Sequence, residues 1–170
     1  MAEPLRADVA LVRLSFLVQT VYAEMCAKHD LSPAQAQLLC MIKDQARGMT
    51  ELARMLRLER PGLSGLVDRI ERRGLLSRST AEHDRRVVRL TPTARGQQIA
   101  EAFYTEVSDR LLEVVAHLSA DDRHQFERIA TSIVHATSVP AVFGNSDRSP
   151  DSPRRTCPPP AAPDEPPAPK

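Results

Sequence analysis

The sequence has no tryptophan, only two tyrosines and four phenylalanines, and only six glycines among its 170 residues. The scarcity of glycine and of β-branched runs argues against an all-β fold, and the length suits one domain with a buried core. No uninterrupted apolar stretch of about 18 residues exists, which by this criterion excludes a transmembrane helix. Residues 1–13 carry charges and lack the apolar block of a secretory signal, so we expect a cytoplasmic protein without a membrane partner.

Cysteine is also scarce, and no two cysteines have the C-x-x-C spacing of a zinc site. Three cysteines are too few and too scattered for a disulfide framework. Cys26 and Cys40 each lie in an apolar stretch and are expected to be buried small hydrophobic residues, whereas Cys157 lies in a polar C-terminal segment. The sequence alone leaves open whether Cys26 or Cys40 is redox-active.

Motifs of catalysis are missing from the sequence. It contains no glycine-rich phosphate loop, no G-x-S-x-G turn and no His-x-x-x-His pair. Glu24, Cys26, His29 and His117 carry atoms that ligate metals, but helical spacing alone does not bring them together. We therefore expect a protein that is not an enzyme and that uses no metal or cofactor.

The formal net charge of +1 conceals an uneven distribution of charge. Residues 47–95 hold twelve arginines and no lysine against six acidic residues, whereas residues 96–140 hold three basic and seven acidic residues. The arginine guanidinium is planar, always charged and suited to phosphate oxygens and guanine edges, so the middle of the chain is a candidate nucleic-acid surface. The alternative is an ordinary solvated basic face in a chain with only three lysines.

Two helices are predicted before the basic segment. Residues 5–29 carry apolar side chains at helical spacing in a stripe so wide that we expect it to pack on more than one partner. The next helix follows a Ser32 cap, with Gln35 in the capping-box position, and is expected to end at residues 47–48. Its predicted core face consists of Ala36, Leu38, Leu39 and Ile42.

The basic segment itself predicts two short helices joined by a tight turn. Thr50 is the expected cap of a helix over residues 51–56, and Pro61 opens a second helix that ends before Gly74. The apolar positions of the second helix are Leu63, Leu66, Val67 and Ile70. Two short helices in this arrangement are typical of a helix-turn-helix.

Two apolar runs after these helices predict a β-hairpin. The expected strands cover residues 75–79 and 87–91, around a charged tip of residues 80–86. A helix-turn-helix followed by a hairpin is a winged helix. Either Thr91 or Thr93 then caps a long helix that is expected to run to about residue 117.

The C-terminal part predicts one more helix and then a change in composition. Ser119 is the expected cap of the last helix, which carries Phe126, Ile129, Ile133 and Val134 on one face. Residues 141–170 hold nine of the fourteen prolines and are expected to be a disordered tail. The predicted domains are an N-terminal dimerisation helix (1–31), a winged helix-turn-helix (32–93), C-terminal dimerisation helices (94–137) and a proline-rich tail (138–170).

The sequence from residue 49 to residue 96 resembles the MarR family of bacterial transcription regulators. The resemblance is carried by residues 49–53 (MTELA), 63–75 (LSGLVDRIERRGL), 84–86 (DRR) and Gly96, in this order and at the family's spacing. It implies a mainly α fold with a small β-wing, in which long terminal helices interlock in a homodimer. The apolar surface of the terminal helices, which exceeds what one winged helix covers, also favours a dimer.

The helix that opens at Pro61 is the predicted recognition helix. Its small leading residues allow the backbone to approach a DNA major groove, and arginines after it and in the wing add phosphate or minor-groove contacts. The predicted DNA-binding residues are Arg60, Gly62, Ser64, Gly65, Arg69, Arg72, Arg73, Arg78, Arg85 and Arg86. For the two glycines, the alternative is close packing against a neighbouring helix.

The resemblance also implies roles for a carboxylate and for an apolar cleft. Asp84 would brace the wing through Arg69 or Arg86, unless it belongs to an ordinary charged turn. Asp68 and Glu71 are expected to pair with arginines of their own helix. A small phenolic or other apolar ligand would bind between the winged helix and the dimer helices, near Phe16, Val21 and Met25.

We therefore expect a homodimeric regulator, most often a repressor in this family, that binds a pseudo-palindromic DNA duplex and is released by a small molecule or an oxidant. The alternative is a winged-helix protein-interaction module with weak, non-specific DNA binding. The sequence does not give the operator, the inducer, the regulated genes, the sign of regulation or the role of the tail.

Overall fold

The computed structural model describes residues 5–81 and 84–137, without the side chains of residues 81–87, and shows a mainly helical fold with one small antiparallel sheet. The predicted fold class is confirmed. The elements of the described residues are α1 (Ala7–Lys28), α2 (Pro33–Ile42), β1 (Arg47–Gly48), α3 (Met49–Leu56), α4 (Arg60–Arg72), β2 (Leu76–Ala81), β3 (Asp84–Pro92), α5 (Ala94–Val114) and α6 (Ala120–Ala136).

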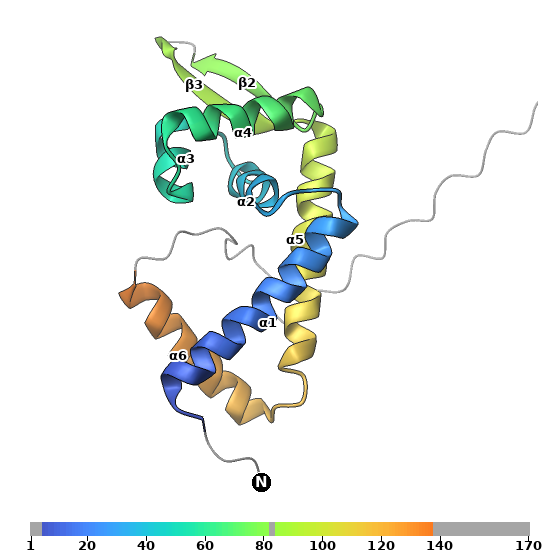
Figure 1. Cartoon of the computed structure of the whole chain (residues 1–170), viewed down its shortest axis with the longest axis vertical. Helices are drawn as coiled ribbons and strands as arrows, with labels where there is room; N and C mark the ends of the chain where they lie inside the picture. Colours follow the sequence, from blue (N-terminus) through green and yellow to red (C-terminus); the bar gives the residue numbers. More distant parts are fainter. Residues whose placement is uncertain (1–4, 82–83, 138–170) are drawn as a thin grey trace, which may run out of the picture.

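The winged helix lies at one end of the molecule, and long helices extend from it. Figure 1 shows α4 and the β2–β3 hairpin at the top, with α3 and α2 beside and below them. Helix α5 runs down from this unit, α1 packs along α5, and α6 lies at the opposite end. Helix α4 and the hairpin are therefore at the end of the molecule farthest from α6.

The core lies where α2 meets α3, α4, the sheet and α5. Leu38, Leu39 and Ile42 of α2 are fully buried, in agreement with the predicted core face of this helix. Phe103 of α5 and Leu90 of β3 reach the same cluster from the long helix and the sheet. Burying these apolar side chains is the main favourable contribution to folding, and it fixes α4 against α2.

The start of α2 is as predicted, but its end is not. The Ser32 hydroxyl accepts a hydrogen bond from the Gln35 amide at 3.3 Å, and the Gln35 side chain accepts one from the Ser32 amide at 2.9 Å. The helix ends at Ile42, and residues 47–48, which we expected to end it, form β1 instead.

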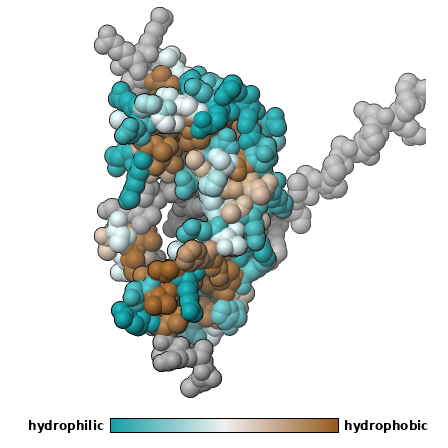
Figure 2. Space-filling view, in the orientation of Figure 1, coloured by the Kyte–Doolittle hydropathy of each residue, from teal (hydrophilic) through white to brown (hydrophobic). Residues whose placement is uncertain are grey.

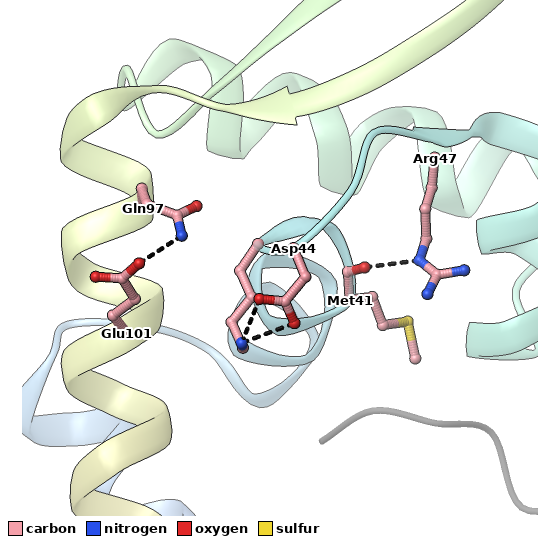
Figure 3. A network of polar contacts seen from close by, with 6 residues as sticks. Met41, Asp44, Arg47, Gln97 and Glu101 are labelled. Atoms are coloured by element: carbon pink, nitrogen blue, oxygen red, sulfur yellow. Dashed lines mark hydrogen bonds and ion pairs between the residues drawn. The ribbon is translucent and has the colours of Figure 1, made fainter. Parts of the chain in front are cut away.

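Strand β1 has only two residues and forms one edge of the sheet, next to β3. Arg47 pairs with Leu90 and Gly48 with Arg89 in antiparallel register. The Arg47 guanidinium donates to the Met41 carbonyl at 2.7 Å and pairs with Glu51, as Figure 3 shows for the Met41 contact. The pairing with β3 keeps the segment extended, and the sequence pattern around residues 47–48 does not predict it.

Helix α3 begins at Met49, two residues earlier than predicted. Gly48, not Thr50, is the residue before its first turn, and Gly48 makes no side-chain cap. The helix ends at Leu56 and is followed by Arg57, whose φ of 53° is left-handed, and the Leu58 amide donates to the Ala53 carbonyl at 3.0 Å. The tight turn that follows leads directly into α4, as a helix-turn-helix requires.

The wing hairpin has longer strands than the sequence predicts. Strand β3 is central and pairs with β1 on one side and β2 on the other. The β2–β3 register runs from Leu76 opposite Pro92 to Ala81 opposite Asp84, with an irregularity at the end of β2. Most of the residues predicted to form the tip therefore belong to the strands. Cross-strand hydrogen bonds continue for as long as the two strands lie side by side.

The start of α5 decides between the two predicted caps in favour of Thr93. The Thr93 hydroxyl accepts from the Gly96 amide at 3.0 Å and donates to the Gly74 carbonyl at 2.7 Å. A Cβ on Gly96 would lie 1.7 Å from the Leu75 carbonyl oxygen. Gly96 is thus required for the close approach of α5 to the chain between α4 and β2.

Helices α1 and α6 expose a large apolar surface in the single chain. No residue of α6 is buried, and α1 buries only Val21 and Cys26. Figure 2 shows hydrophobic residues gathered on the half of the molecule where α1 and α6 lie. The large exposed apolar residues are Leu5, Val9, Leu11, Val12, Leu14, Phe16, Leu17, Val18, Leu112, Phe126, Ile129, Ile133 and Val134. We call this set the open apolar surface.

By length and composition, α1 alone among the helices of the described residues also meets the requirements for crossing a membrane. It has 22 residues, its most apolar 18-residue stretch has a mean hydropathy of 1.4, and 11% of that stretch is buried. Our exclusion of such a helix was too strict, because it required an uninterrupted apolar run. Arg13 and Glu24 interrupt the run without lowering the mean hydropathy enough.

Candidate nucleic-acid interface

Helix α4 turns its apolar side inward, as the sequence predicts. Leu63, Leu66, Val67 and Ile70 are buried against α2 and the sheet. The opposite side therefore presents Gly62, Gly65 and Arg69, because residues three and four apart share one face of a helix. This outward side is adjacent to the wing strand β2 and carries no large apolar residue.

The two glycines of α4 do not pack against another helix. A Cβ on Gly62 would meet no atom within 4 Å, and a Cβ on Gly65 would meet only the Arg69 guanidinium, at 3.7 Å. The alternative of close helix packing is therefore wrong for both positions. Their missing side chains instead leave a strip of helix backbone open to solvent, over which the Arg69 side chain folds back.

Arg60 and Arg69 lie at the two ends of this strip. Both are exposed, and no carboxylate in the described part of the chain forms an ion pair with either. A concave surface of about 570 Å³ opens beside Arg60. It is lined by Gly48, Met49, Thr50, Glu51, Arg60, Leu63, Ser64, Val88 and Arg89. Guanidinium groups from α4 and β3 thus converge near the first turn of α4, where unpaired backbone N–H groups favour an anion.

Three predicted DNA-binding arginines, Arg72, Arg73 and Arg78, have hydrogen-bond or ion-pair partners within the protein. Arg78 of β2 pairs with Asp68 at 2.5 Å and with Glu71 at 3.1 Å, both on α4. The expectation that these two carboxylates pair within their own helix is wrong, because the wing strand brings Arg78 closer. Arg72 donates to the Asp68 main-chain carbonyl at 3.3 Å.

Arg73 connects the end of α4 to the α1–α2 junction. Its guanidinium pairs with Asp30 at 2.9 Å and donates to the Gln35 side chain at 3.3 Å. The sequence analysis did not assign Asp30 or Gln35 to this role, since they lie about forty residues from Arg73 and no local pattern links them. Gln35 also completes the α2 capping box, so α1, α2 and α4 meet at one point.

The wing-tip residues are only partly described. The backbones of Asp84, Arg85 and Arg86 lie in β3, and Asp84 pairs with Ala81 of β2. Their side chains lie outside the described part of the structure. The predicted DNA contacts of Arg85 and Arg86 and the bracing role of Asp84 therefore remain predictions.

The three residues expected near a ligand do not meet in one protomer. Val21 is buried and Met25 packs on the core, whereas Phe16 is 65% exposed. Phe16 lies on the opposite side of α1 from Met25, since nine residues at about 100° each amount to about two and a half turns. The proximity of these three residues to a ligand remains a prediction.

The two cysteines in the described residues are buried and free. Burial raises the pKa of the Cys40 thiol to about 12 and raises the pKa of Cys26 as well. At neutral pH both thiols are protonated, and the thiolate is the reactive form. Neither cysteine has the environment of an oxidant sensor.

Of the four residues considered for a metal, His29 has another partner. It contacts Glu106 of α5 at 3.1 Å, and Lys28 contacts the same carboxylate at 2.9 Å. Partial burial opposes ionisation, but the hydrogen bonds from Lys28 and His29 outweigh it and lower the pKa of Glu106. Within the described ranges, no three His, Cys, Asp or Glu side chains cluster around a common point.

Part of this chain matches a known family model, and its fold matches solved structures. Residues 29–87 match the family model described as MarR family. The fold is shared with apo wild-type MarR from E. coli, with a TM-score of 0.66, 22% identity, and coverage of 78% of this chain and 99% of that chain.

Two structures of complexes share the fold as well. One is a MepR variant from S. aureus bound to an oligodeoxyribonucleotide, with a TM-score of 0.57, 18% identity, and coverage of 78% of this chain and 99% of that chain. The other is NadR in complex with 4-hydroxyphenylacetate, with a TM-score of 0.61, 19% identity, and coverage of 78% and 95%. At these identities, the structural likeness shows a common fold.

Proposed function

We propose that this chain, a winged-helix protein of the MarR family, regulates transcription by binding duplex DNA as a homodimer in the cytoplasm. Helix α4 enters a major groove, and the wing contacts the flanking backbone. The observation that carries this proposal is the open strip of α4 over Gly62 and Gly65, with exposed Arg60 and Arg69 at its ends, neither in an ion pair with another described side chain. The DNA-bound MepR variant, which has the same fold, supports it.

A second copy of the chain is the partner that we propose for the open apolar surface. Contiguous apolar patches of this kind mark interaction sites, and here the patch lies on the long helices, away from α4. A two-fold dimer presents two copies of α4 to two half-sites, so the operator is pseudo-palindromic. In this proposal the exposed side of α1 packs on protein and does not enter a membrane.

We propose that the protein represses transcription and leaves its operator when a small phenolic or other apolar molecule binds. The structure of NadR with 4-hydroxyphenylacetate supports a ligand of this class. An oxidant acting on Cys26 or Cys40 is disfavoured by their burial. The two DNA-binding units of the dimer can adopt an arrangement that fits the operator or one that does not. A ligand that binds the second arrangement more tightly shifts the dimer toward it and away from the operator.

The test is selection of bound duplexes from a random pool, followed by mobility shift with the enriched sequence. We expect an enriched pseudo-palindrome. Arg60→Ala and Arg69→Ala should each weaken its binding by about tenfold or more, as expected for lost base or phosphate contacts. Arg123→Ala on α6 removes the same charge far from α4 and should leave binding unchanged.

The glycine-rich face of α4 also favours a second candidate, a module that binds DNA only weakly and without sequence preference. Two of its outward positions have no side chain with which to read bases. In that case no sequence would be enriched, and binding would fall steeply with salt concentration. Unchanged binding in both the Arg60 and the Arg69 variant would remove α4 from the interface.

A further inference from the structure

A single guanidinium connects the wing to the recognition helix. Arg78 lies in β2, opposite Leu90 of the central strand β3. One of its terminal nitrogens lies 2.5 Å from Asp68 and the other 3.1 Å from Glu71. Asp68 and Glu71 are three residues apart and thus neighbours on the surface of α4.

The geometry of this contact is more restrictive than that of an ordinary surface pair. The planar fork of arginine fixes direction as well as distance when both of its arms are engaged. Here the arms reach two separate carboxylates, so both the tilt and the position of β2 along α4 are set. Two carboxylates facing one guanidinium also leave the group with no excess positive charge for a phosphate.

We infer that Arg78 is a positioning residue: it holds the wing at a fixed angle to α4 through Asp68 and Glu71, and it does not contact DNA itself. This replaces the DNA contact predicted for Arg78 from the sequence, and it rests on the proposed function. In the proposed complex, α4 and the wing contact the same duplex. If the angle between them changes, the wing no longer fits the DNA backbone when α4 lies in the major groove. Arg78 therefore acts on affinity and specificity through the carboxylates.

The two roles of Arg78 predict opposite effects when its partners are removed. The double variant Asp68→Asn, Glu71→Gln deletes two negative charges from the recognition helix. Simple electrostatics then predicts tighter DNA binding, since the surface becomes more positive and Arg78 is released for phosphate. The positioning role predicts weaker binding, because the wing loses its attachment.

We expect the double variant and Arg78→Gln each to weaken operator binding by about tenfold, the size of coupling typical for groups in direct contact. Adding Arg78→Gln to the double variant should cause no further loss. The dependence of affinity on salt should keep its slope in Arg78→Gln. Arg123→Gln serves as the charge-matched control, and thermal melts verify that each variant is folded.

Tighter binding by the double variant would overturn the inference. So would a salt slope in Arg78→Gln that falls by about 0.9, the value of one lost phosphate contact. Hydrogen exchange of the free protein gives a measure that needs no DNA: Arg78→Gln should speed exchange in β2 and in the last turn of α4, and unchanged exchange would refute the contact. If the unaltered protein binds no duplex, the proposed function fails, while the exchange data still decide whether Arg78 holds the wing.

Discussion

Glycines in this chain have opposite structural roles at two positions. At Gly96 the Leu75 carbonyl occupies the space that a side chain would need, so the missing Cβ permits α5 to approach the turn before β2. At Gly62 the space is open, and the missing Cβ only lowers the helix propensity of α4. Adding one methyl group would therefore disrupt packing at Gly96 but not at Gly62. At Gly62 the effect of the missing Cβ is to leave the backbone of α4 accessible.

The two glycines predict opposite changes in stability. Gly96→Ala should lower the free energy of unfolding by about 3 kcal/mol or more, because backbone must move to relieve the overlap. Gly62→Ala should raise it by roughly 0.5–1 kcal/mol through helix propensity. Urea denaturation of the two variants measures both values. A stable Gly96→Ala protein would contradict the close approach of α5 to Leu75.

Cysteine reactivity is a second property of single residues. In a Cys157→Ser background, Cys26 and Cys40 should react with a thiol reagent at pH 8 only very slowly, because burial keeps both protonated and inaccessible. Reaction should become fast in denaturant. Rapid labelling of the folded protein would show that one of the two thiols is available to oxidants.

At the scale of an element, the end of α1 is held to α5 by charge as well as by packing. His29 lies over Phe103 with ring centroids 5.8 Å apart, and it shares the Glu106 carboxylate with Lys28. On its other side, Asp30 pairs with Arg73 at the end of α4. The α1–α2 junction thus joins the long helices to α4.

The Glu106 contact predicts a pH dependence of stability. The pKa of Glu106 is lower in the folded chain than in the unfolded chain, so its contribution is present at neutral pH and disappears as the pH falls through the folded value. Glu106→Gln should destabilise the protein at pH 7 by about 0.5–1 kcal/mol. The difference from the unaltered protein should shrink as the pH falls below the ordinary pKa of a glutamate, and it should vanish once Glu106 is protonated in the folded chain. A constant difference from pH 7 to pH 3 would exclude an ionic contribution.

At the scale of the whole molecule, the chain consists of a well-buried winged helix and long helices that leave much apolar surface open. Exposed apolar surface of this extent marks an interaction site. In the homodimer that we propose, two α4 helices lie on one assembly, and α1 and α5 connect the proposed DNA-binding face with the proposed dimer surface.

Ile129→Asp tests this coupling at the open apolar surface. The introduced charge should convert a dimer to a monomer in size-exclusion chromatography with light scattering, since a carboxylate in an apolar interface is strongly destabilising. His124→Asp, which adds the same charge on the other side of α6, should leave the dimer intact. A native protein that is monomeric at micromolar concentration, or soluble only with detergent, would contradict the proposed assembly.

The sequence by itself determined the elements that depend on local chemistry. The Ser32–Gln35 capping box, Gly74 at the end of α4 and the inward face of α4 follow from spacing and cap preferences, and each is confirmed. These features succeed as predictions because a helix and its caps are formed by residues three or four positions apart. The arginine-rich segment also marked the face on which the candidate interface lies.

Only the tertiary structure decided which arginines are available. Arg73 and Arg78 look like Arg60 and Arg69 in the sequence, yet Arg73 pairs with Asp30 of the α1–α2 junction, and Arg78 of β2 pairs with Asp68 and Glu71 of α4. Arg60 and Arg69 are exposed and form no ion pair with another described side chain. Strand β1 is another such case, because it exists only through pairing with β3, about forty residues away. Contacts between distant segments depend on how helices and strands pack, and the order of residues along one element does not contain that information.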